Sequence, residues 1–152
     1  MDQTAFYGVV SAINFTLLGL WWLAVKDRVD FVSASFRRMA YFVSLQFAIP
    51  ATVALLAQVA PEIPEVWRSA FALAGVAGVV GVLLLTKEMS AQTDARALPT
   101  VFAVLGVPLY VLVIVVALWP GVVDHAGIEL SPIEVEGFLL SILVFLGVQE
   151  AW

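Results

Sequence analysis

The sequence predicts an all-α integral membrane protein, a bundle of five transmembrane helices that forms one domain over residues 1–152. Four stretches carry no charged residue, at 5–25, 39–60, 69–86 and 97–119. Each is close to the roughly 20 residues that a helix needs to cross a bilayer. Composition agrees, because the chain is 62% hydrophobic and only 12% charged, whereas soluble domains carry about 25% charged residues.

Four of the predicted helices follow directly from these stretches and lie at about 4–25, 39–60, 66–86 and 98–119. The fifth, at 132–151, is less direct, because its uncharged core at 137–149 is too short to span alone. However, Ser131-Pro132-Ile133-Glu134 has the pattern of a capping box with proline at the first helical position, which predicts a helix start. The alternative is a short helix in the outer leaflet, which would leave both termini outside.

The distribution of basic residues predicts the orientation. Six of the seven Lys and Arg residues lie in the loops 26–38 and 87–97, and only Arg68 lies elsewhere. Short cytoplasmic loops collect Lys and Arg, so we expect these two loops to face the cytoplasm and the N-terminus to lie outside. With five crossings the C-terminus is cytoplasmic. The Ala- and Val-rich, cysteine-free composition favours the plasma (inner) membrane of a prokaryote.

The third helix carries a pattern of small residues that predicts close helix packing. Its small residues recur at spacings of three and four, and such spacings let helix backbones approach each other in a membrane. We therefore expect this helix at the centre of the bundle or at a subunit contact. The predicted packing residues are Ala74, Gly75, Gly78 and Gly81.

Two prolines fall inside predicted helices. Pro50 lies in the second helix and Pro108 in the fourth, both near mid-depth. A proline removes one backbone hydrogen bond, so each predicts a kink. A kink can open a polar cavity, although kinks that serve packing alone are commoner.

Polar residues at membrane depth are the candidates for a functional pathway. In the first two helices these are Asn14 and Gln46, each of which either lines a polar path or makes a hydrogen bond between helices. On the fifth helix a stripe along one face contains Glu134, Ser141, Phe145 and Gln149. Glu136 lies in the same first turn as Glu134. These carboxylates form an acidic outer mouth, or they are solvated partners of the helix dipole. The remaining candidates on this helix are Ser141 and Gln149.

No motif predicts an enzyme. The chain has no cysteine and one histidine, and it lacks the nucleophile, zinc and phosphate-loop signatures, so we expect no catalytic residue, no metal and no cofactor. The net charge of −5 argues against a nucleic-acid partner.

Two functions remain open. The first is a homo-oligomeric, cation-preferring ion channel or small transporter with its pathway between subunits. The alternative is a non-catalytic accessory subunit that assembles with a larger membrane protein. The predicted partners are the lipid bilayer and a second copy of the chain for the first function, and the larger complex for the alternative.

Overall fold

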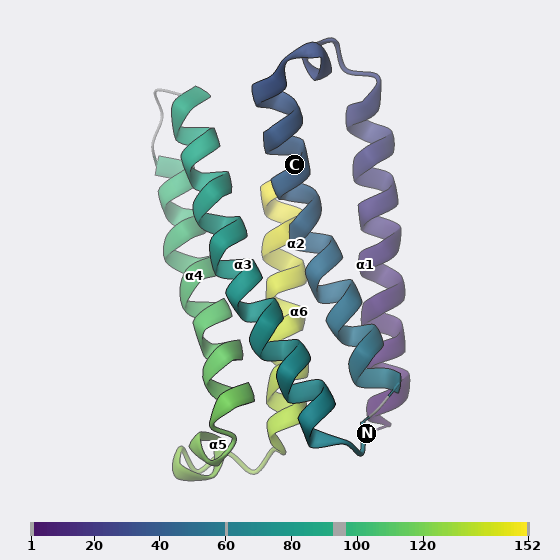
Figure 1. Cartoon of the computed structure of the whole chain (residues 1–152), viewed down its shortest axis with the longest axis vertical. Coiled ribbons are helices and arrows are strands. Elements are labelled where there is room, and N and C mark those ends of the chain that lie inside the picture. Colours follow the sequence, from purple (N-terminus) through teal and green to yellow (C-terminus); the bar gives the residue numbers. More distant parts are fainter. Residues whose placement is uncertain (1, 60, 93–96, 152) are drawn as a thin grey trace.

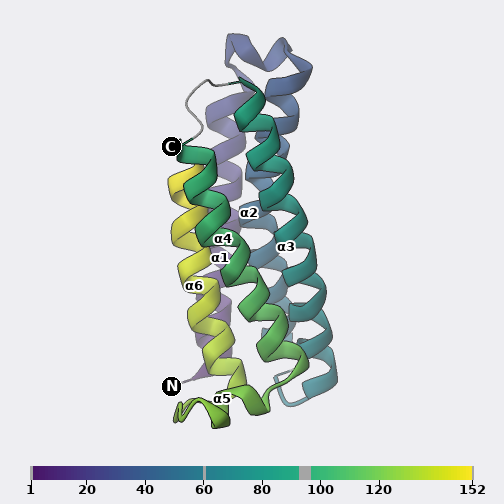
Figure 2. The same cartoon turned by 90° about the vertical axis from the view of Figure 1, so that its left-hand side faces the viewer.

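The structure is a computed structural model that describes residues 2–59, 61–92 and 97–151. In this part of the chain five long helices run side by side along the length of the molecule (Figures 1 and 2). They are α1 (Gln3–Lys26), α2 (Ala34–Val59), α3 (Pro64–Gln92), α4 (Ala97–Leu118) and α6 (Pro132–Ala151). The 3-10 turn η1 (Val29–Val32) and the short helix α5 (Gly121–His125) lie in the connections.

The predicted all-α class is confirmed, and so is the number of span-length helices. The five long helices among the described residues are each long and apolar enough to cross a membrane. The alternative required a short fifth helix, whereas α6 has 20 residues in one continuous helix. At about 1.5 Å per residue it is about 30 Å long, which matches the hydrocarbon core.

The predicted capping box at the start of α6 forms through the side chain of Glu134. Its carboxylate accepts hydrogen bonds from the backbone N–H of Ser131 at 2.9 Å and from the hydroxyl of the same serine at 2.8 Å. The N–H groups at the start of a helix have no partner within the helix. A carboxylate that accepts a hydrogen bond at this point stabilises the first turn.

Two helices are longer than the sequence predicted. Helix α2 begins at Ala34 and α3 continues to Gln92, beyond the charge-free stretches that defined them. Charge-free stretches mark only the part of a helix that lies in lipid, and a helix is free to continue into water. Near the start of α2 and the end of α3, Arg38 of α2 pairs with Glu88 of α3 at 3.1 Å.

The bundle has two chemically different ends. The N-terminus and α5 lie at one end, while η1 and the C-terminus lie towards the other (Figure 1). The end with η1 carries the basic loop 26–38 and is called the basic end; the end with α5 carries Asp2, Glu62, Glu65 and Asp124 and is called the acidic end. Residues 93–96 of the predicted basic loop 87–97, including Arg96, lie outside the described residues.

The small residues of α3 pack within the chain. A Cβ added at Gly78 would overlap the ring of Tyr110 in α4, and one at Gly75 would meet the side chain of Ile114. Gly81 faces Gln46 of α2, and Ala74 packs against the main apolar cluster. The close approach that the sequence predicted therefore joins α3 to α4, in the interior of one chain.

Both prolines lie in unbroken helices. Pro50 is buried inside α2 and Pro108 is exposed on α4. Beside Pro50, the hydroxyl of Ser11 in α1 donates to the carbonyl of Ala51 at 3.1 Å. This bond ties α1 to α2 at the point where the helix has lost one of its own hydrogen bonds.

Candidate functional site

The interior of the bundle near its acidic end contains a carboxyl group. Glu136 is 0% exposed, and neither of its side-chain oxygens has a hydrogen-bond partner within the described residues. It is the fifth residue of α6 and therefore lies about 6 Å along the axis from the start of that helix. Ile133 and Leu140, which share its helix face, are buried as well. Glu136 is thus inside the bundle, and the interpretation as a solvated partner of the helix dipole does not describe it.

Tyr7 of α1 lies beside this carboxyl. Its side chain is 1% exposed, and its hydroxyl lies 3.4 Å from a Cβ built at Gly137, the residue that follows Glu136. The Tyr7 hydroxyl donates to the backbone carbonyl of Ile133 at 2.5 Å. A phenol has a single O–H, so this hydroxyl is left with lone pairs that can accept a hydrogen bond from a neighbour.

A second polar group lies where four helices meet. Gln46 of α2 is 3% exposed and accepts a hydrogen bond at its Oε1 from the hydroxyl of Tyr110 at 2.9 Å. Cβ atoms added at Gly81 of α3 and Gly147 of α6 would stand 3.7 and 3.4 Å from the side chain of Gln46. Its Nε2 has no partner in the described part of the chain. A buried amide therefore holds one unused donor at the centre of the molecule.

Asn14 of α1 is also fully buried, and only one of its two polar side-chain atoms has a hydrogen-bond partner in the described chain. Its Nδ2 donates to the carbonyl of Val10 in its own helix at 2.8 Å, while its Oδ1 has no partner among the described residues. The predicted hydrogen bond between helices is therefore not formed by Asn14. Ser11 and Trp21 make such bonds instead, to carbonyls of α2 at 3.1 and 3.0 Å.

A further buried polar atom was not predicted. Glu150, near the C-terminal end of α6, has a buried Oε2 without a partner in the described chain. It lines a cavity of about 490 Å³ at the basic end. Fourteen residues separate it from Glu136, which places the two carboxyls about 21 Å apart along the axis and within about 40° of one face. In the sequence Glu150 has no distinguishing neighbour, and it is marked only by its position at the end of the predicted fifth helix.

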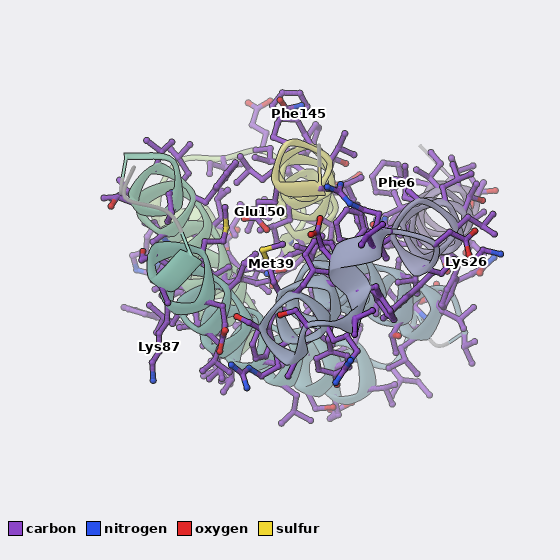
Figure 3. The ribbon with its side chains drawn as sticks, turned by 90° about the horizontal axis from the view of Figure 1, so that it is seen from above. Phe6, Lys26, Met39, Lys87, Phe145 and Glu150 are labelled. Carbon is purple, nitrogen blue, oxygen red and sulfur yellow. The ribbon has the colours of Figure 1, made fainter. Side chains whose placement is uncertain are left out.

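The other predicted residues of α6 lie away from the interior. Glu134 caps the helix, and Ser141 is exposed and donates to the carbonyl of Gly137 in its own helix at 3.0 Å. Gln149 is exposed at the rim of the basic-end cavity. Phe145, which shares this stripe, is 62% exposed and points away from the bundle in Figure 3.

The three buried candidates and Glu150 form a series along the bundle. Ordered from the acidic to the basic end, the atoms without a partner are both carboxyl oxygens of Glu136, Oδ1 of Asn14, Nε2 of Gln46 and Oε2 of Glu150. Buried polar groups normally have partners, and those that lack them mark sites for water, ions or chemistry. Such a series suits the passage of a proton or small cation. The described residues contain no group of three His, Cys, Asp or Glu side chains that would hold a metal ion.

Comparison with known proteins gives no further guide to the site. No family model, no curated protein sequence and no solved structure matches this chain.

Proposed function

We propose that this protein is a small cation channel or transporter whose ion is the proton, and that Glu136 carries the proton through the interior of a single chain. The observation that carries the proposal is the complete burial of a carboxyl whose two oxygens have no partner in the described structure. An unpaired charge in an apolar interior is costly, and ionisable residues at membrane depth are typical of ion and proton routes. A proton is the smallest ion that relieves this cost.

No described cationic side chain is placed to neutralise Glu136. Arg68, at the acidic end, donates to the carbonyls of Ala117 and Leu118 at 2.7 and 2.9 Å, and so caps the end of α4. The three ion pairs found among the described residues all lie at the basic end. Among the residues that the structure describes, Glu136 therefore has no fixed counter-ion, which suits a group that binds and releases a proton.

The pathway in this proposal runs through one chain. Glu136 faces helices of its own chain, so a pore between subunits would not reach it. The lone pairs of the Tyr7 hydroxyl stand at the outer part of the route, and the amides of Asn14 and Gln46 stand at its middle. Following the distribution of basic residues, we place the basic end in the cytoplasm and the acidic end outside.

The decisive experiment is proton flux into liposomes that contain the purified protein. A potassium gradient with valinomycin imposes a membrane potential, and a pH-sensitive dye inside the liposomes reports proton entry. We expect the wild-type protein to acidify the lumen faster than empty liposomes do. Glu136→Gln should reduce the rate to that of empty liposomes. Glu134→Gln is the matched control, because it changes the same chemical group on the opposite face of the same helix.

Two results would contradict the proposal. One is a wild-type rate equal to that of empty liposomes, and the other is a Glu136→Gln rate equal to that of the wild type. Helical circular dichroism and an unchanged gel-filtration profile establish that each variant is folded. They separate loss of the carboxyl from loss of the structure.

A groove on the outside of the bundle favours the second candidate, an accessory subunit. Phe6 of α1 and Glu134, Phe138 and Ser141 of α6 line a groove of about 360 Å³ at the acidic end. Most of its lining is apolar and includes Gly137, and a groove with a small residue in its wall lets another membrane helix pack closely. Absence of flux from the wild type, together with association with a larger membrane complex in its native membrane, would favour this function.

A further inference from the structure

The basic end of the bundle encloses a cavity between the helix ends. Its volume is about 490 Å³, within the range of about 300–1,000 Å³ that is typical of small-molecule sites. Residues of α1, α2, α3, α4 and α6 contribute to its wall, so the cavity belongs to the tertiary structure and to no single helix. Seen from above, Glu150 and Met39 lie in the space between the helix ends (Figure 3).

The wall of this cavity is aromatic and rich in sulfur. Its large apolar side chains are Trp21, Phe36, Met39, Met89 and Phe102. Aromatic rings attract cations through their faces, and methionine adapts to ligands of irregular shape. Trp21 is held in place by its indole N–H, which donates to the carbonyl of Ala40 at 3.0 Å.

The charges of the cavity favour a cationic ligand. Glu150 contributes a carboxyl group, and one of its oxygens is buried without a partner in the described chain. Arg28 is the cationic side chain in the wall, and its charge is compensated at the surface. Its guanidinium lies 3.7 Å from the carboxylate of Asp30 and 5.4 Å from the centre of the Phe36 ring. Glu150 is therefore the acidic group in the wall that has no ion-pair partner among the described residues.

We propose that this cavity is a binding site for a monovalent organic cation with an apolar, aromatic body. The positive charge pairs with Glu150, and the body packs against the aromatic and methionine side chains. This site goes beyond the proposed proton route, because binding here requires neither Glu136 nor transport.

Tetraphenylphosphonium tests the proposal directly. The probe is titrated into the full-length protein in nanodiscs of zwitterionic lipid, with binding measured by calorimetry and empty nanodiscs subtracted. We expect saturable binding of one tetraphenylphosphonium per chain. Tetraphenylborate has the same shape and the opposite charge, and it should bind far more weakly.

Three variants locate the site. Glu150→Gln should weaken binding of the cation by at least about tenfold, because opposite charges attract strongly where the effective dielectric constant is low. Glu136→Gln should bind as the wild type does, since its carboxyl lies at the other end of α6. Arg28→Gln should bind the cation at least as tightly, because it removes a positive charge from the wall.

The proposal is overturned by equal binding to wild type and Glu150→Gln, by non-saturable partition, or by a preference for tetraphenylborate. The last result would assign the site to an anion held by Arg28. Failure of this proposal is distinct from failure of the proton route, which is measured by flux and depends on Glu136. Saturable binding of the cation without proton flux would support the cation site and contradict the proton route.

Discussion

The contact between α3 and α4 gives the sharpest test of the fold, through the substitution Gly78→Ala. A Cβ at position 78 would overlap three atoms of the Tyr110 ring, Cδ1, Cε1 and Cζ. That ring cannot move freely, because Tyr110 is 2% exposed and its hydroxyl bonds to Gln46 at 2.9 Å. One methyl group therefore acts on both the helix contact and the central hydrogen bond.

The expected cost has two parts. Overpacking a close contact costs about 1–3 kcal/mol. If the ring moves and its hydroxyl leaves Gln46, the amide loses its remaining side-chain partner, which costs about 1–3 kcal/mol more. We therefore expect Gly78→Ala to lower the free energy of unfolding by about 2–6 kcal/mol.

Unfolding by sodium dodecyl sulfate in mixed micelles, followed by circular dichroism, measures this change. Gly19→Ala is the matched control, because a Cβ added at Gly19 meets no atom within 4 Å. That variant should be no less stable than the wild type, and it should gain up to about 1 kcal/mol from the higher helix propensity of alanine. If Gly78→Ala unfolds at the same detergent fraction as Gly19→Ala, Gly78 of α3 does not pack against the Tyr110 ring of α4.

The remaining predictions concern single contacts. Gln46→Leu and Tyr110→Phe should each cost about 1–3 kcal/mol in the same titration, and the double variant should cost less than their sum, because it leaves no unpaired group. Tyr7→Phe should cost about 1 kcal/mol and speed amide hydrogen exchange in the first turns of α6. Arg38→Ala should cost no more than about 1 kcal/mol, because Arg38 is the largely exposed member of its pair with Glu88, and the difference should shrink in high salt in the same unfolding titration.

The helices were predictable because the bilayer imposes a strong constraint on sequence. A charged residue inside the hydrocarbon core is so costly that charge-free stretches mark the membrane-spanning segments. The ends of α2 and α3 were not predictable in this way, since both helices extend beyond the residues that lipid constrains. The turn formed by α5 was also missed. Its five residues carry no periodic pattern long enough to detect.

The buried amides were predictable, but their partners were not. Asn14 and Gln46 stood out as strong hydrogen-bonding groups within apolar stretches. Whether an amide bonds to its own helix, to another helix or to nothing depends on which side chains the packing brings near. Asn14 bonds to Val10 in its own helix and Gln46 to Tyr110 in another, and no spacing in the sequence distinguishes these outcomes.

The two glutamates at the start of α6 show why a polar stripe is a poor guide to the interior of a membrane protein. Positions 134 and 136 are about 200° apart on a helix, so only one of them faces the bundle. In water the apolar face would be the inner one, but in lipid both faces are apolar and the contrast disappears. Small residues are the better signal, because they let helices approach. Gly137 meets Phe6 and Tyr7, and Gly147 meets Gln46 and Phe47. Together these glycines mark the inner face of α6, and Glu136 lies on it.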